Sequence, residues 1–234
     1  MEHGELFIFQ AGEPIAEGFS CVNALLHTRK EQLPSISEYV NRLFTSGLTR
    51  VNVLIDDLSS WTEDDLKLYQ EKLVEMKNSL VDFFAGGKQK SLNLLTDRLF
   101  LERMNNCNAG LEHFTLGPDG NIYLCPAFYY SNRSMAIEGL QVAARLEHLL
   151  KLENAPLCRN CDAYHCQRCF FRNLAATEEI NVPGEKQCLV AYMEREVSRQ
   201  LQEELEAKKL IPFPNRYRIP RLNFRDPFQV SKVW

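Results

Sequence analysis

Short apolar runs rich in β-branched residues recur through the first hundred positions, and helical patterns lie between the later ones. Each run is short enough to form one β-strand. The runs are Leu6–Phe9, Cys21–Leu26, Val51–Ile55 and Ser91–Leu95. Strands that alternate with helices build parallel sheets, so this pattern predicts an α/β layer.

Two helices are predicted between these strands. The first, Ile36–Leu43, follows Pro34, which is typical of a helix start. The second begins near Ser60 and Glu63, which have the spacing of a capping box, and it stops at Gly86. Its apolar residues recur at steps of three and four and so share one helical face. They are Leu66, Tyr69, Leu73, Met76, Leu80 and Phe84.

The strand spacing limits how much of a barrel this segment can form. An eight-unit βα barrel uses roughly 30 residues per unit, so residues 1–104 hold only two or three units. We expect a small open α/β layer or the last part of a larger barrel. In a barrel the carboxyl ends of the strands line the active site, so four residues that follow strands are site candidates, with helix capping as the alternative. They are Asp56, Asp57, Thr96 and Asp97.

The pattern after residue 104 changes to short strands and turns. Phe114–Leu116 and Asn121–Leu124 flank a Gly-Pro-Asp-Gly turn, which predicts a β-hairpin. We expect this hairpin to bring Cys107 and Cys125 to one end.

Two amphipathic helices and a basic tail complete the chain. The helices are predicted at Gln141–Lys151 and Leu189–Ala207, where they serve packing. The tail, Lys208–Trp234, has seven Lys or Arg against one Asp and four prolines, so it is an extended arm over the surface or an arm that docks an acidic partner. The chain thus divides into an α/β segment at 1–104, a cysteine-rich α+β domain at 105–207 and the arm at 208–234.

Composition and charge exclude several classes of protein. The chain is 45% hydrophobic and 25% charged, as in ordinary globular proteins. Its net charge of -4 argues against a nucleic-acid partner. No apolar run approaches the roughly 20 residues of a membrane span, and the N-terminus has no basic start. We therefore expect a cytoplasmic protein with no membrane partner.

Cysteine is the unusual residue in this chain. Seven of the eight cysteines lie after residue 104: Cys107, Cys125, Cys158, Cys161, Cys166, Cys169 and Cys188. In a reducing compartment such a set is typical of metal binding rather than of disulfides. Thiolates select zinc or iron–sulfur clusters over calcium and magnesium. The remaining Cys21 stands alone on a predicted strand, where a buried core thiol is expected.

The cysteine spacing favours two iron–sulfur clusters. A zinc ribbon separates its two C-x2-C pairs by 15 to 20 residues, whereas only four residues lie between Cys161 and Cys166. Close spacing of this kind is typical of ferredoxins, in which the last cysteine of a run reaches a second cluster. The economical assignment gives one four-iron cluster to Cys158, Cys161, Cys166 and Cys188, and the other to Cys107, Cys125 and Cys169 with one open iron. Zinc binding and buried packing remain the alternatives.

Several polar residues accompany these cysteines. His113 is a candidate for the missing ligand, with a place on the hairpin surface as the alternative. His165 is expected to support a ligand or to be exposed. Asp162, Arg159 and Arg168 are expected to set hydrogen bonding and charge around the clusters.

The cysteine pattern resembles the SPASM domain. Cys107, Gly120-x4-Cys125, the run of four cysteines and Cys188 fill all seven positions, although the run here is C-x2-C-x4-C-x2-C where the common form is C-x2-C-x5-C-x3-C. More specifically, four segments look like the CXXX-repeat peptide maturases, a group of radical SAM enzymes. These segments are Thr96-Asp97-Arg98, residues 105–110, residues 125–130 and residues 158–164.

The resemblance implies a function as well as a fold. It implies a partial radical-SAM barrel at 1–104 and, at 105–207, a SPASM-type domain whose seven cysteines hold two auxiliary [4Fe-4S] clusters. Enzymes of this family modify a ribosomally made, cysteine-rich precursor peptide. The chain departs from the family because it lacks C-x3-C-x2-C, the motif that binds the cluster at which S-adenosylmethionine is cleaved. S-adenosylmethionine is therefore expected only if that core is supplied elsewhere, which fits a chain without its N-terminal part.

Three hypotheses follow. The first is the C-terminal part of a radical SAM peptide maturase, in which the clusters relay electrons or bind the precursor peptide. The second is a stand-alone peptide-binding or electron-transfer partner of a separate radical SAM subunit, and an electron donor such as ferredoxin or flavodoxin suits both. The third is a zinc-stabilised interaction domain.

Overall fold

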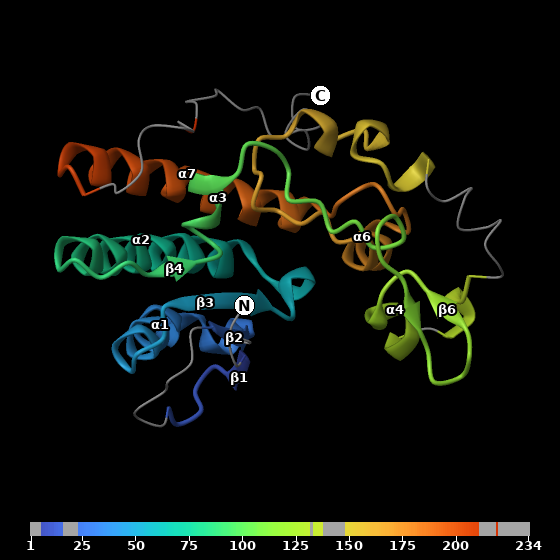
Figure 1. Ribbon diagram of the computed structural model, residues 1–234, viewed down its shortest axis with the longest axis horizontal. Coiled ribbons are helices and arrows are strands. Elements are labelled where there is room, and N and C mark those ends of the chain that lie inside the picture. The colour runs from blue at the N-terminus through green and yellow to red at the C-terminus, as the bar shows by residue number, and fades with distance from the viewer. Residues whose placement is uncertain (1–5, 16–22, 132, 138–147, 211–218, 220–234) are drawn as a thin grey trace. The chain divides into compact units, whose positions relative to one another are not determined.

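A computed structural model describes residues 6–15, 23–131, 133–137, 148–210 and 219 (Figure 1). These residues form two compact units. The first unit takes the described residues within Met1–Glu102 and Leu189–Phe224, and the second takes those within Arg103–Cys188.

The first unit contains the predicted parallel sheet, with its four strands in the order β1-β2-β3-β4. The strands are β1 (Leu6–Gln10), β2 (Asn23–Thr28), β3 (Arg50–Ile55) and β4 (Ser91–Leu92). The helices are η1 (Lys30–Ser35), α1 (Ile36–Thr45), η2 (Leu58–Ser60), α2 (Glu63–Ala85), α3 (Asp97–Phe100) and most of α7 (Glu185–Ala207). The mixed α/β class expected from the sequence is confirmed.

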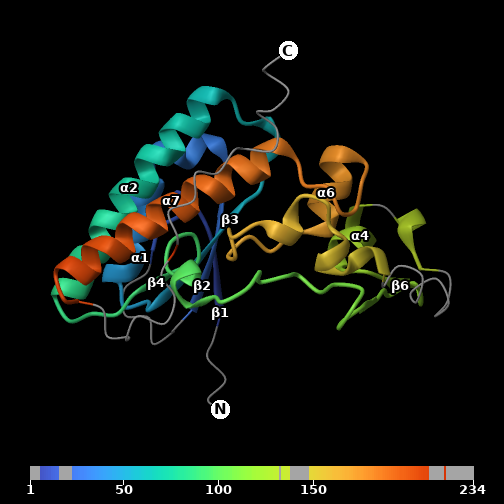
Figure 2. The ribbon, with the colours of Figure 1, turned by 90° about the horizontal axis from the view of Figure 1, so that it is seen from above.

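The two faces of this sheet differ in chemistry. Ala24 and Leu26 of β2 and Val51 and Val53 of β3 share one core with the buried residues of α1, α2 and α7. Figure 2 shows these three helices on the same side of the strands. Alternate residues of a strand point to the other face. On β2 and β3 these residues are half-buried and mostly polar: Asn23, Leu25, His27, Arg50, Asn52 and Leu54.

Helix α2 begins with a capping box, but not the predicted one. The backbone N–H of Thr62 donates to Asp65 Oδ2 at 2.7 Å, and the backbone N–H of Asp65 donates to Thr62 Oγ1 at 3.3 Å. The assignment to Ser60 and Glu63 is wrong because Ser60 lies in η2 and donates its hydroxyl to the carbonyl of Asp57. The sequence offers two overlapping capping-box patterns, at Ser60 and at Thr62. Because Ser60 lies in the 3-10 helix η2, the helix uses the box at Thr62.

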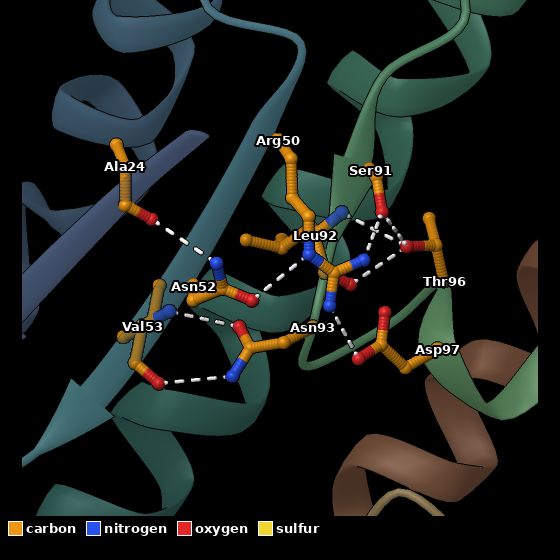
Figure 3. A network of polar contacts seen from close by, with 9 residues as sticks. All are labelled: Ala24, Arg50, Asn52, Val53, Ser91, Leu92, Asn93, Thr96 and Asp97. Carbon is orange, nitrogen blue, oxygen red and sulfur yellow. Dashed lines mark hydrogen bonds and ion pairs between the residues drawn. The ribbon is translucent and has the colours of Figure 1, made fainter. Parts of the chain in front are cut away.

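Strand β4 is shorter than the predicted run, which extended to Leu95. The side chain of Asn93 accepts a hydrogen bond from Val53 N at 2.8 Å and donates one to Val53 O at 3.0 Å (Figure 3). This amide therefore makes the contacts that a further ladder residue would make. The chain then turns, and Thr96 N donates to Leu92 O at 2.7 Å.

The second unit contains the predicted hairpin and short helices. The hairpin pairs β5 (Thr115–Leu116) with β6 (Ile122–Tyr123) in antiparallel register. The other elements are α4 (Pro126–Ser131), η3 (Arg133–Met135), η4 (Leu152–Asn154), η5 (Cys158–Asn160) and α6 (Phe170–Thr177). A small core of Tyr123, Leu124, Phe128, Leu150 and Phe170 has Cys107 and Cys125 packed against it.

Helix α7 differs from its predicted place. It begins at Glu185, four residues earlier than expected, and its residues from Leu189 onward belong to the first unit. The sequence division had grouped 189–207 with the cysteines. The apolar positions Val190, Val197 and Leu201 instead complete the core against α2.

Three expectations lie outside the described residues. They concern Cys21 as a core thiol, most of the helix at Gln141–Lys151, and the basic arm after Leu210 apart from Ile219. Among the helices that the structure describes, none combines the length and the apolar character needed to cross a bilayer.

Candidate metal centre

All seven cysteines of the second unit are reduced thiols. Cys158 is buried and the other six are half-buried.

Cys107, Cys125 and Cys169 form the first group of thiols. Burial raises the pKa of Cys125, the N–H groups of Phe128 and Ala127 oppose this rise, and the charges of Cys169 and Cys107 add to it. Each of the other two thiols therefore lies within electrostatic reach of Cys125.

The backbone explains how these three distant cysteines meet. The N–H of Cys107 donates to the carbonyl of Gln167 at 2.9 Å, which joins the segment before the hairpin to the cysteine run. Cys125 directly precedes α4, and Cys169 is the N-cap residue of α6. Two helix starts and one backbone bridge thus bring three parts of the sequence together.

Cys158, Cys161 and Cys166 form the second group. The pKa of Cys158 is raised to about 12, mainly by burial; the charges of Cys166 and Cys161 add to this rise, and that of Arg168 opposes it. The N–H of Cys161 donates to the carbonyl of Cys158 at 3.0 Å, and the N–H of Ala163 donates to Cys161 Sγ at 3.4 Å. An N–H···S hydrogen bond of this kind stabilises a thiolate ligand and tunes its metal.

Cys188 connects to the second group through its neighbour. Gln187 Nε2 donates to Cys166 Sγ at 3.9 Å, so the start of α7 reaches this group. Three of the four thiols assigned to one cluster, Cys158, Cys161 and Cys166, are thus linked by charge, and Cys188 directly follows the residue that bonds Cys166.

Within the described part of the chain, no three His, Cys, Asp or Glu side chains form a group that could hold a single metal ion. The ligands of one tetrahedral zinc lie about 4 Å apart, as its Zn–S bond lengths require. The four thiols of a four-iron cluster each bind a different iron atom, so they lie farther apart than the ligands of a single metal ion.

The polar residues among the cysteines occupy different environments. Arg168 is fully buried with 0% exposure, and Asp162 is 7% exposed. His165 is half-buried beside Cys166, whereas His113 and Arg159 are exposed on the surface.

Arg168 was expected from the sequence to set charge around the cysteines, but its complete burial was not. It donates from Nε to Asn106 Oδ1 at 2.8 Å and from Nη1 to Asn181 Oδ1 at 3.1 Å, and its Nη2 donates to the carbonyl of Leu150. Its φ is +46°, a left-handed conformation that is rare outside glycine. The sequence signal is an Arg inside C-x2-C, but Asn106 and Asn181 carry no pattern that marks them as its partners.

The candidates at the sheet do not share one edge. Asp56 follows β3 and contacts His27 Nδ1 at 3.0 Å at the carboxyl ends of the strands. Asp97 instead pairs with Arg50, the first residue of β3, at 2.8 Å (Figure 3). The expectation that Asp97 joins Asp56 is wrong, because the turn after Asn93 carries the chain back toward the amino end of the sheet.

The other two sheet candidates have structural partners. Asp57 accepts hydrogen bonds from Lys30 N at 3.2 Å and from Trp61 Nε1 at 3.1 Å. Thr96 Oγ1 both accepts from Leu92 N and donates to Leu92 O, at 2.9 Å each. These hydrogen bonds to nearby structural groups account for both residues, and neither side chain caps the helix that follows it.

No protein-family model matches this chain, and no curated protein is significantly similar to it.

Proposed function

We propose that this chain is the iron–sulfur-binding SPASM portion of a radical SAM peptide maturase that modifies a ribosomally made, cysteine-rich peptide. The observation that carries the proposal is the electrostatic coupling of thiols within two sets of three. Cys125 lies within electrostatic reach of Cys107 and Cys169, and Cys158 lies within reach of Cys161 and Cys166. Two separate clusters would require two such sets of thiolate ligands.

The donor set fits two [4Fe-4S] clusters. Cys158, Cys161, Cys166 and Cys188 would hold one cluster with a complete set of four thiolates, which are the usual ligands of such clusters. Half-burial and an N–H donor at Cys161 also suit a cluster, since both tune its reduction potential.

Cys107, Cys125 and Cys169 would hold the second cluster and leave one coordination position without a protein ligand. A thiolate or amide of the precursor peptide is the proposed occupant of that position. When bound, the clusters supply one-electron chemistry, either with the peptide or with a donor such as ferredoxin or flavodoxin.

The first unit supports the barrel part of the proposal. When strand order follows chain order and every crossover is right-handed, the helices lie on one face of a parallel sheet. A doubly wound sheet has helices on both faces. Here α1 and α2 pack against one face, while the other carries His27, Arg50 and Asn52. A polar face of this kind suits the interior of a barrel whose remaining strands come from elsewhere.

In this proposal the chain does not bind S-adenosylmethionine by itself. The sequence contains no C-x3-C-x2-C motif. Cleavage of S-adenosylmethionine would therefore take place on a core supplied by another segment or by a separate radical SAM subunit.

Metal analysis of anaerobically reconstituted protein tests the proposal. We expect about eight iron and eight sulfide per chain and an absorption band near roughly 400 nm, as two four-iron clusters imply. Cys21→Ser is the matched control, because Cys21 belongs to neither group, and its iron content should equal that of the natural chain. Zinc in place of iron in anoxically purified protein would overturn the proposal.

A further inference from the structure

Arg168 is a cation buried among neutral oxygens. Its guanidinium is 0% exposed and lies 4.8 Å from the ring centroid of Phe170. Its three hydrogen bonds go to the side-chain amides of Asn106 and Asn181 and to the carbonyl of Leu150. All three acceptors are uncharged, so none of them neutralises the guanidinium.

A buried charge of this kind needs compensation from elsewhere. Burying an ion without an opposite charge costs several kcal/mol in general, and Arg stays protonated at any ordinary pH. The negative charges that favour the protonated guanidinium come first from three cysteines and then from Glu153. Those cysteines are Cys158, Cys107 and Cys166.

The position of Arg168 explains why both groups of thiols reach it. Arg168 directly precedes Cys169, and its partner Asn106 directly precedes Cys107, so two ligands of the first group adjoin the guanidinium network. The neighbouring Gln167 accepts the N–H of Cys107 at 2.9 Å. Cys166 of the second group lies two residues before Arg168 in the chain, and its charge and that of Cys158 favour the protonated guanidinium. One cation thus serves both groups.

We propose that Arg168 is the shared counter-charge of the two cysteine groups, and that its fixed positive charge raises the reduction potential of both clusters together. The inference rests on the proposed iron–sulfur occupancy. Each cluster gains one negative charge when it accepts an electron, so a nearby buried cation stabilises the reduced form. Arg168 acts through the clusters and is a positioning residue.

Redox titration with dithionite, followed by electron paramagnetic resonance, tests this role in the full chain. In Arg168→Met both midpoint potentials should become more negative, each by at least a tenfold change in the reduction equilibrium, which is about 59 mV for one electron. Arg168→Lys keeps the charge and should leave both potentials close to the natural values.

A second variant keeps the arginine and neutralises it in place. Asn181→Asp puts a carboxylate where the amide accepts from Nη1 at 3.1 Å, and it should lower both potentials as Arg168→Met does. Asn160→Asp is the matched control. It adds the same charge beside Cys161 on an exposed residue, where water screens it, so the potentials should hardly move. Asn181→Asp also decides the matter if Arg168→Met does not fold.

The outcomes separate this inference from the proposed function. Failure of the natural chain to bind iron would overturn the proposed function and the inference with it. Normal iron content with unchanged potentials in Arg168→Met or Asn181→Asp would overturn the inference alone. A shift confined to one of the two clusters would contradict a shared counter-charge.

Discussion

Gly110 is a position where both backbone conformation and space require glycine. Its φ is +79°, in the left-handed region. A Cβ at this position would lie 2.3 Å from Leu124 Cδ2 and 2.8 Å from Leu150 Cδ1. Leu124 and Leu150 belong to the core against which Cys107 packs, so this close approach helps to position the thiol.

Gly120 offers a matched control, because it has the same φ of +79° but no heavy atom of the described residues lies within 4 Å of the place that its Cβ would take. We expect Gly120→Ala to cost about 1–2 kcal/mol from backbone conformation alone. Gly110→Ala should cost about 1–3 kcal/mol more, because the methyl group overpacks the core. Amide hydrogen exchange of residues 107–128 measures both. Equal costs would contradict the close approach at Gly110.

Asn93 illustrates which residue-scale features the sequence does not reveal. Its apolar neighbours Leu92, Leu94 and Leu95 make the segment resemble a continuing strand. All three are buried, as a strand would require, but the Asn93 amide bonds Val53 and ends the ladder. A side chain that takes the place of a backbone hydrogen-bond partner in this way depends on the position of β3, so the local sequence pattern does not predict it.

At the scale of elements, a buried hydrogen bond joins α2 to α7. Tyr69 is 0% exposed and donates its hydroxyl to Glu194 Oε1 at 2.6 Å. Lys77 and Glu204 pair at 2.5 Å farther along the same two helices. The sequence predicted both helices and their apolar faces, but not this partnership, because the two partners are 125 positions apart.

We expect Tyr69→Phe to destabilise the first unit by about 1–3 kcal/mol, because Glu194 loses a buried donor. Tyr39→Phe is the control. Within the described residues the buried Tyr39 hydroxyl has no hydrogen-bond partner, so its removal should cost little. Urea unfolding followed by the fluorescence of Trp61, in a Trp234→Phe background, measures both. Equal losses in the two variants would argue against the contact between the helices.

The Tyr69 hydroxyl also makes the stability of the first unit depend on pH in the alkaline range. Burial, with the charge of Glu194, raises the pKa of Tyr69 well above its usual value. The folded chain therefore keeps this proton after the unfolded chain begins to lose it at a pH of about 10. The contribution is complete below that pH and falls as the pH rises above it. The free energy of unfolding should thus decline more steeply above a pH of about 10 in the natural chain than in Tyr69→Phe.

At the scale of the whole molecule, local patterns and long-range pairing differ in how well the sequence predicts them. The parallel sheet, helices α1 and α2 and the hairpin follow from apolar periodicity and turn residues, and the structure confirms them. The sequence does not predict the unit to which α7 belongs, since an amphipathic helix can pack its apolar face against the core of either unit.

The cysteines allow a prediction beyond the fold, because metal chemistry constrains ligand type and spacing together. Their spacing predicts two groups of ligands. In the structure, Cys125 lies within electrostatic reach of Cys107 and Cys169. Arg168 was expected near the cysteines, but its burial and the asparagines that hold it could not be predicted, because the local sequence does not indicate which polar residues fold inward.

Iron counting in paired single-thiol variants tests the central claim most directly. The comparison uses Cys169→Ala from the first group and Cys161→Ala from the second, with anaerobic reconstitution, iron analysis and Mössbauer spectroscopy. Two independent centres predict about four iron remaining in each variant, with a different spectral component lost from each. Loss of the same component from both, or an unchanged iron content in either, would contradict the account.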